Sequence, residues 1–121
     1  MAGGIGLAVS DRSRPVFAFS GDGGGMYTVQ AIWSAARHDL NVVFVICSNR
    51  SYKLLQLNLH QFREERGIEQ HPYPLSFDLS KPELGFVEMA AGMGVPGVKV
   101  VTEADIGPAM GPFRVSTNSC S

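Results

Sequence analysis

Two uninterrupted apolar runs, at residues 16–19 and 42–47, are the clearest feature of the hydrophobic pattern. Short runs without polar interruptions are typical of strands buried on both faces, and the β-branched content of the second favours a strand over a core helix. Between them, apolar residues recur at three- and four-residue steps from Met26 to Ala36, which predicts an amphipathic helix. Because such a unit closes as a right-handed parallel crossover, both strands are expected to end at one carboxyl edge.

The rest of the pattern continues this alternation. Residues 2–9 predict a close-packed helix, and a leucine and phenylalanine stripe predicts another at residues 52–65. The capping box Ser80-Lys81-Pro82-Glu83 predicts a helix that begins there and ends at Gly92 and Gly94. The proline-containing stretch 67–79 is expected to be an exposed loop. Further expected elements are a third strand at 98–101, a short helix at 103–110 and the beginning of a fourth strand at 112–115.

Strands that alternate with helices predict an α/β fold, in which a mostly parallel sheet forms the middle of three layers and helices cover both faces. At 121 residues, the chain is long enough for one core and too short for two domains. We therefore expect one domain, or part of one, over residues 1–115, followed by an irregular tail at 116–121.

Charge and composition exclude several functions. Ten Lys and Arg residues balance eleven Asp and Glu residues, without a basic block interleaved with aromatic residues, so a nucleic-acid partner is not expected. No apolar run is long enough to cross a membrane, and residues 1–10 lack the features of a secretory signal, so we expect a cytoplasmic protein. Cys47 and Cys120 fit neither a disulfide framework nor a metal-ligand spacing.

Asp22 and Asn49 each follow one of the two apolar runs and are the main candidate ligands. The glycine loop, Gly21-Asp22-Gly23-Gly24-Gly25, joins a strand to a helix, where backbone amides can approach a phosphate. The Asp22 carboxylate would repel a bare diphosphate, so we expect a cation between the two that offsets this repulsion. Mg²⁺ prefers oxygen ligands, which the Asp22 carboxylate, the Asn49 amide and the Ser51 backbone carbonyl would supply.

Two alternatives remain beside this interpretation, and a third is excluded. In the first, Asp22 only caps the turn, Asn49 makes an Asx-turn and the glycines shape a tight connection, so the chain is a noncatalytic, truncated α/β module with a structural or regulatory role. In the second, the glycines belong to a Rossmann-type nucleotide-binding domain, although Met26 stands where the fingerprint requires glycine or alanine. A P-loop is excluded, because no Gly-Lys-Ser or Gly-Lys-Thr follows the glycines.

The triplet Gly21-Asp22-Gly23, with Asn49 placed 27 positions after Asp22, resembles the fingerprint of enzymes that depend on thiamine diphosphate (ThDP). The flanking segments Ala31-Ile32-Trp33-Ser34-Ala35-Ala36-Arg37 and Asn49-Arg50-Ser51-Tyr52 resemble the branch that contains acetolactate synthases, benzoylformate decarboxylases and related 2-oxo-acid decarboxylases. The similarity extends over about residues 2–110.

The resemblance implies a role for each residue of the site. Asp22 and Asn49 match the Mg²⁺ ligands, and Ser51 matches the ligand that uses its backbone carbonyl. Gly23 and Gly24 match positions that contact the diphosphate, within a cofactor-binding loop that also includes Gly21 and Gly25. Gly24 replaces a serine often found there, so the loss of a hydroxyl contact is expected to weaken diphosphate binding. Tyr52, Leu54 and Leu55 correspond to a segment near the thiazolium and the substrate.

The resemblance also implies a lyase or transferase that acts on a 2-oxo acid, in which the cofactor stabilises the carbanion that forms when carbon dioxide leaves. The activating glutamate of this family belongs to a separate pyrimidine-binding domain, usually of a partner subunit, and no residue here matches it, so we expect no catalytic residue in this chain. Since family members are several times longer and form homo-oligomers, we expect a fragment that is inactive alone and binds ThDP weakly or not at all.

Overall fold

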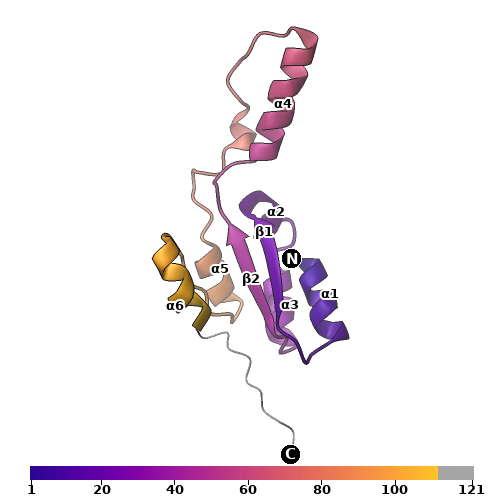
Figure 1. Cartoon of the computed structure of the whole chain (residues 1–121), viewed down its shortest axis with the longest axis vertical. Helices are drawn as coiled ribbons and strands as arrows, with labels where there is room; N and C mark the ends of the chain where they lie inside the picture. The colour runs from indigo at the N-terminus through magenta and orange to yellow at the C-terminus, as the bar shows by residue number, and fades with distance from the viewer. Residues whose placement is uncertain (112–121) are drawn as a thin grey trace, which may run out of the picture.

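The computed structural model describes residues 1–111, in which helices alternate with two strands (Figure 1). This arrangement is the predicted α/β fold. The elements in chain order are α1 (Ala2–Ser10), β1 (Val16–Gly21), α2 (Asp22–Met26), α3 (Ala31–Arg37), β2 (Val42–Cys47), α4 (Lys53–Arg66), the 3-10 turn η1 (Leu75–Phe77), α5 (Phe86–Gly92), the 3-10 turn η2 (Glu103–Asp105) and α6 (Ile106–Met110).

The two strands β1 and β2 pair in parallel, as predicted. Their register begins with Val16 opposite Val42 and ends with Gly21 opposite Cys47, so the two strands run in step over their whole length. The segments that follow them, α2 and the chain leading into α4, therefore leave the sheet at the same edge (Figure 1).

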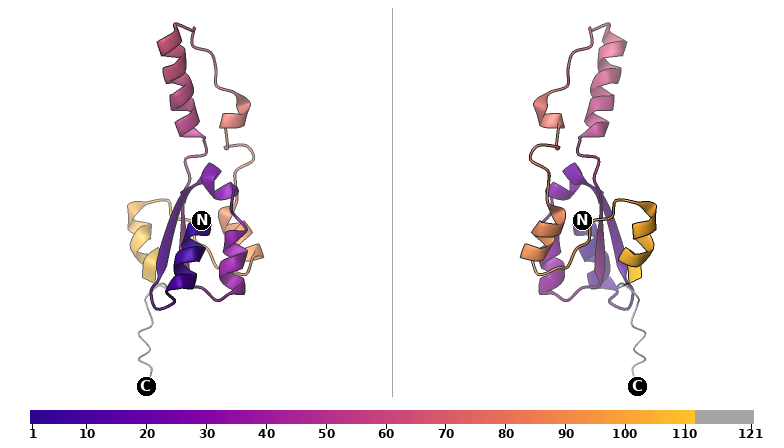
Figure 2. Two further views of the ribbon diagram at one scale, coloured as in Figure 1. Left: turned by 90° about the vertical axis from the view of Figure 1, so that its right-hand side faces the viewer. Right: turned by 90° about the vertical axis from the view of Figure 1, so that its left-hand side faces the viewer.

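Helices lie on both sides of the strands. α1 packs against β1 so closely that a Cβ on Gly4 would lie 2.7 Å from the Cβ of Ala18, which explains the glycine at that position. α3 lies on one side of the strands and α6 on the other (Figure 2). The buried apolar residues are few and mostly small: Ala8, Ala31, Ile32, Ala35, Val43 and Ala90.

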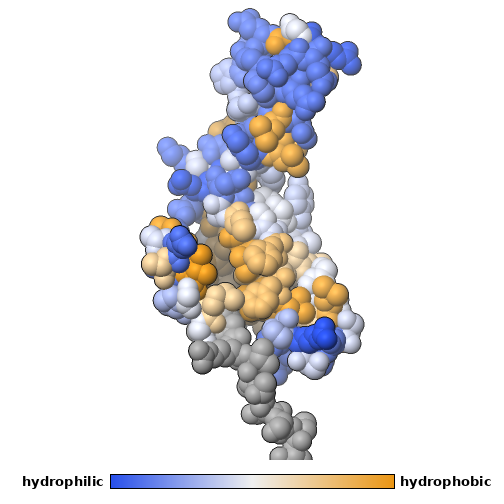
Figure 3. All heavy atoms as spheres, viewed as in Figure 1, coloured by the Kyte–Doolittle hydropathy of each residue, from blue (hydrophilic) through white to orange (hydrophobic). Residues whose placement is uncertain are grey.

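One face of β1 remains uncovered within the described part of the chain. Its side chains alternate between half-buried and exposed, and Phe17 and Phe19 are 40% and 69% exposed. Hydrophobic residues gather over the strands on this side of the molecule (Figure 3). An exposed aromatic face on a strand favours association with other surfaces.

The helix predicted from Met26 to Ala36 is wrong as a single element, because α2 ends at Met26 and α3 begins at Ala31. Residues 27–30 form tight turns between them, in which Thr28 N donates to Gly25 O at 3.2 Å and Ala31 N donates to Thr28 O at 3.0 Å. The β-branched residues Thr28 and Val29 have low helix propensity, which disfavours a continuous helix across this stretch.

The helix predicted to begin at Ser80 is also wrong at its start, because α5 begins at Phe86. The expected capping box does not form. The Ser80 amide donates to the Asp78 side chain at 2.8 Å, and Glu83 accepts a hydrogen bond from Lys99 Nζ at 2.8 Å. Both groups are therefore committed to partners outside the predicted box.

The third strand predicted at residues 98–101 does not form, and the described part of the chain has only β1 and β2. Val98 and Val101 are 59% and 77% exposed, since no neighbouring strand pairs with this segment. The predicted short helix at 103–110 is present as η2 followed by α6. The fourth strand expected at 112–115 and the tail at 116–121 lie outside the described residues.

The predicted helix at 52–65 is confirmed as α4, which projects from the body of the molecule (Figure 1). Gly67, with a φ of 62°, ends the helix in the left-handed conformation. The loop after it is exposed as expected and contains the short turn η1. No helix in the described residues is long and apolar enough to cross a membrane.

Candidate functional site

The candidate site lies where β1 and β2 end. The last paired residues are Gly21 and Cys47, so the next residues, Asp22 and Ser48, continue side by side at the carboxyl edge of the sheet. Asp22 is only 3% exposed and is the one buried polar or charged side chain in residues 1–111. A buried carboxylate is costly unless it accepts hydrogen bonds, so its partners define the site.

Three donors surround the Asp22 carboxylate. Oδ1 accepts a hydrogen bond from the Gly23 amide at 2.9 Å, and Oδ2 accepts one from Ser48 Oγ at 3.0 Å and one from the Arg50 amide at 2.6 Å. The carboxylate thereby joins the end of β1 to the turn that follows β2. The predicted convergence of the two strand ends is present, with the residues on both sides of Asn49 in direct contact with Asp22.

The turn after β2 has an unusual backbone. Arg50 has a φ of 56°, in the left-handed region that non-glycine residues adopt at a cost. The Asn49 side chain accepts a hydrogen bond from the Ser51 amide through Oδ1 at 3.0 Å, which is the Asx-turn of the structural alternative. Thus the turn that presents the Arg50 amide to Asp22 is stabilised by Asn49.

The oxygen atoms of the predicted ligands retain capacity to bind a cation. A carboxylate has about four acceptor positions and an amide oxygen has two, of which the described contacts use three on Asp22 and one on Asn49. Ser51 pairs with Asp78 in an isolated antiparallel bridge, and the hydrogen bonds of this bridge are made by the flanking residues. The backbone carbonyl of Ser51 takes no part in them. Ser51 Oγ is buried without a partner among the described residues. Carboxylate, amide and carbonyl oxygens are the types of ligand that Mg²⁺ prefers.

The glycine loop adjoins these ligands. The Tyr52 ring lies against Gly23, where a Cβ would overlap the ring carbons Cδ1 and Cζ at 2.8 and 2.9 Å. Gly24 is exposed, and the nearest atom to a Cβ there would be Ser20 Oγ at 3.3 Å. The backbone of Gly24 is therefore accessible to an anion, as a diphosphate-binding role requires.

Tyr52 links the turn to the glycine loop. Burial raises the pKa of its hydroxyl above the usual value, and the neighbouring Tyr27 and the Asp22 carboxylate raise the pKa further. The neutral phenol is therefore the form that this environment favours. By contrast, Leu54 is 69% exposed on the first turn of α4 and does not share this environment.

Two residues of the site were not among the sequence candidates: Ser48 and Arg50. Their contacts with Asp22 follow from the strand register, which places Ser48 beside Asp22, and from the left-handed backbone of Arg50. The register could have been inferred from aligning the two apolar runs by their ends. The conformation of Arg50 has no comparable signal in the sequence, because arginine rarely adopts it.

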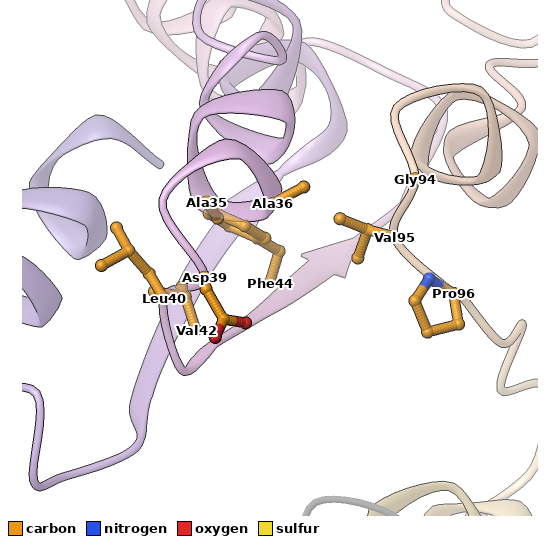
Figure 4. A pocket seen from close by; sticks show the side chains of 9 residues that line it. All are labelled: Ala35, Ala36, Asp39, Leu40, Val42, Phe44, Gly94, Val95 and Pro96. Carbon is orange, nitrogen blue, oxygen red and sulfur yellow. The ribbon is translucent and has the colours of Figure 1, made fainter.

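A surface cavity of about 210 Å³ lies away from this site. It is bounded by the end of α3, the beginning of β2 and residues 94–96, with Asp39 at its rim (Figure 4). Since β2 begins at this cavity and ends beside Asp22, the cavity and the candidate site lie at opposite edges of the sheet.

Comparisons with known proteins agree on one family. The family model described as thiamine pyrophosphate enzyme, C-terminal TPP binding domain, matches residues 1–117. The protein IlvX of Mycobacterium tuberculosis, assigned as an acetolactate synthase large subunit, is 38% identical over 107 residues, covering 88% of this chain and 20% of its own length. The benzoylformate decarboxylase of Pseudomonas aeruginosa is 29% identical over 106 residues, covering 88% of this chain and 18% of its own.

A solved structure supports the same relationship. The thiamine diphosphate-dependent 4-hydroxybenzoylformate decarboxylase of Rhodococcus jostii RHA1 matches with a TM-score of 0.72 and 30% sequence identity. The match covers 91% of this chain and 19% of that chain. The present chain thus spans about a fifth of the length of the relatives it matches.

Proposed function

We propose that this chain binds the diphosphate of ThDP through Mg²⁺. The proposal starts from its family: the chain belongs to the thiamine pyrophosphate enzymes and matches their C-terminal domain, which binds thiamine pyrophosphate (TPP, another name for ThDP). The whole enzyme would be a 2-oxo-acid decarboxylase or an acetolactate-synthase-like carboligase, since relatives of both kinds match the chain. The main observation behind the proposal is the buried Asp22 carboxylate. It accepts hydrogen bonds from the turn after β2 and still has a free acceptor position among the described contacts.

In this proposal, three residues supply the protein ligands of Mg²⁺. Asp22 supplies a carboxylate oxygen that its three donors hold in a fixed orientation. Asn49 supplies its amide oxygen while it keeps the hydrogen bond from the Ser51 amide. Ser51 supplies its backbone carbonyl. Mg²⁺ commonly takes one or two carboxylates together with phosphate oxygens and water, which this set permits.

The glycine loop would hold the diphosphate itself. We assign Gly23, Gly24 and the adjoining Gly21 and Gly25 to this role because the absence of side chains lets the backbone approach the anion. Gly24 is exposed beside the cation ligands, while Gly25 is packed against Ile46 and Phe86. Mg²⁺ would offset the repulsion between the Asp22 carboxylate and the diphosphate.

Tyr52 and Leu54 are proposed to lie near the thiazolium and the substrate. The contact of Tyr52 with Gly23 supports this placement, since it puts the ring beside the diphosphate-binding loop. When bound, ThDP supplies the carbanion chemistry by which 2-oxo acids lose carbon dioxide. The residues of this chain would contribute binding and orientation.

The complete site is proposed to need a second domain. No residue here corresponds to the activating glutamate, so we place it in a pyrimidine-binding domain of a partner subunit in a cytoplasmic homo-oligomer. The isolated chain is then expected to bind ThDP weakly and to release no carbon dioxide from pyruvate or benzoylformate. Such release by the purified chain would contradict this part of the proposal.

The binding proposal is tested by titrating the 121-residue chain with ThDP, with and without Mg²⁺, while following its amide signals by NMR, which detects weak binding. We expect Mg²⁺-dependent shifts at Gly23 and Gly24 that disappear in Asp22→Ala. Shifts that need no Mg²⁺, or that persist in Asp22→Ala, would contradict the proposal. Magnesium-independent shifts with NAD would support the Rossmann alternative, and no shifts with either ligand would favour the noncatalytic module.

A further inference from the structure

The two oxygens of the Asp22 carboxylate have unequal surroundings. Oδ2 accepts two hydrogen bonds, from Ser48 Oγ at 3.0 Å and from the Arg50 amide at 2.6 Å, whereas Oδ1 accepts one, from the Gly23 amide. Each carboxylate oxygen has about two acceptor positions. Among the described contacts, Oδ2 is therefore saturated, and the remaining acceptor position of the carboxylate is on Oδ1.

This asymmetry restricts how Asp22 can bind a cation. With Oδ2 saturated, the carboxylate can offer a single oxygen. Mg²⁺ requires near-octahedral geometry at about 2.0–2.1 Å and suits such a ligand, while Ca²⁺ accepts more oxygens, at about 2.3–2.6 Å, and often takes both oxygens of one carboxylate. A Ca²⁺ ion that used both oxygens of Asp22 would have to displace one of the two donors from Oδ2.

We propose that Ser48 is a specificity-determining residue that biases the Asp22 site toward Mg²⁺ and against Ca²⁺ by occupying Oδ2. The proposal rests on the function proposed above. Of the two donors to Oδ2, the Arg50 amide belongs to the backbone and is retained in any variant except proline. The Ser48 hydroxyl is the donor that a substitution removes, and its removal frees one acceptor position on Oδ2 while the Arg50 amide still holds the carboxylate.

Variants at position 48 separate this role from a structural one. Ser48→Ala should shift the ratio of Ca²⁺ to Mg²⁺ affinity toward Ca²⁺ by about tenfold, which corresponds to one hydrogen bond to a charged group. Ser48→Thr keeps the hydroxyl and should keep the original ratio. Ser34→Ala, which removes a hydroxyl that donates to Gln30 O on α3, is the matched control and should leave the ratio unchanged.

The measurement uses the full 121-residue chain with ThDP at one fixed concentration. MgCl₂ and CaCl₂ are titrated separately, and the apparent affinities are taken from the amide shifts of Gly23 and Gly24. Equal changes in both affinities in Ser48→Ala would overturn the proposal, because a purely structural loss does not distinguish the ions. In that case Asp22-dependent binding by the unchanged chain would still support the proposed function. Absence of Asp22-dependent binding of either ion would overturn both.

Discussion

The Tyr52 ring lies directly against the backbone of Gly23, so the N-cap residue of α4 contacts the loop that follows β1. A Cβ at position 23 would overlap three ring carbons of Tyr52. Gly23→Ala is therefore expected to lower the free energy of unfolding by about 1–3 kcal/mol, as overpacking does. Gly24→Ala is the matched control, since its Cβ would meet only the flexible Ser20 side chain at 3.3 Å. Equal stabilities in urea denaturation would contradict the importance of this contact.

A hydroxyl at position 24 should strengthen diphosphate binding. Gly24 is exposed beside the proposed cation ligands and has no side chain to donate to a phosphate oxygen. Gly24→Ser is expected to tighten Mg²⁺-dependent ThDP binding about three- to tenfold, the range for one added hydrogen bond. The comparison is with Gly24→Ala, which adds a Cβ without a donor. Similar ThDP affinities of the two variants in NMR titrations would argue against a diphosphate at this loop.

Neutralising Asp22 should weaken both folding and cation binding. In Asp22→Asn, one amide oxygen replaces two carboxylate oxygens, so the donors from Gly23, Ser48 and Arg50 cannot all be satisfied. We expect a loss of about 1–3 kcal/mol in the free energy of unfolding, together with loss of Mg²⁺-dependent shifts.

Asp39→Asn is the control for the change in charge, because Asp39 lies at the opposite edge of the sheet. Both the stability in urea and the Mg²⁺ titration are measured for the two variants. If Asp39→Asn reduced Mg²⁺ binding as much as Asp22→Asn, the effect would reflect net charge and not a ligand.

The raised pKa of Tyr52 predicts a loss of stability at alkaline pH. Burial, followed by Tyr27 and Asp22, raises the pKa of this hydroxyl above its usual 10.0, so the folded state holds the proton more tightly than the unfolded state. This contribution to stability is fully present below about pH 10 and decreases as the pH rises through the folded-state pKa. Tyr52→Phe should flatten the dependence of the urea midpoint on pH between about 9 and 11. Tyr73→Phe, in the exposed loop, should leave it as in the unchanged chain.

The uncovered face of β1 predicts self-association. Phe19 is 69% exposed beside Phe17 on a strand whose outer face lacks a cover in the described residues. Sedimentation should show concentration-dependent association that Phe19→Ser reduces, because exposed aromatic surface promotes contact between copies. Leu75→Ser is the control, since Leu75 is also exposed but lies in the loop after α4. A single monomeric species at high concentration would contradict this expectation.

The sequence predicted the parts of the fold that depend on local pattern. The apolar runs identified β1 and β2, and their common carboxyl edge followed from the parallel direction of strands joined by a crossover helix. It did not predict elements whose formation depends on tertiary partners. Glu83 bonds to Lys99 instead of capping a helix at Ser80, and Val98 to Val101 has no strand beside it.

The site shows the same division. Asp22 and Asn49 were recognised as candidates because each follows an apolar run, and the structure places the turn around Asn49 against Asp22. Ser48 and Arg50 were not recognised, because their contacts arise from strand register and from one left-handed residue. Their contacts with Asp22 depend on the folded backbone, whereas the liganding roles of Asp22, Asn49 and Ser51 remain predictions.

The most direct test of the proposed cation site is whether Asp22 and Asn49 bind the same ion. Mn²⁺ replaces Mg²⁺ as a paramagnetic probe in the presence of ThDP, and the broadening of amide signals is recorded in the unchanged chain, in Asp22→Ala and in Asn49→Ala. We predict that substoichiometric Mn²⁺ broadens the signals of residues 22–24 and 49–51 together, and that either substitution abolishes the broadening of both groups. Broadening that is centred on another part of the chain, or that survives both substitutions, would contradict a shared cation site.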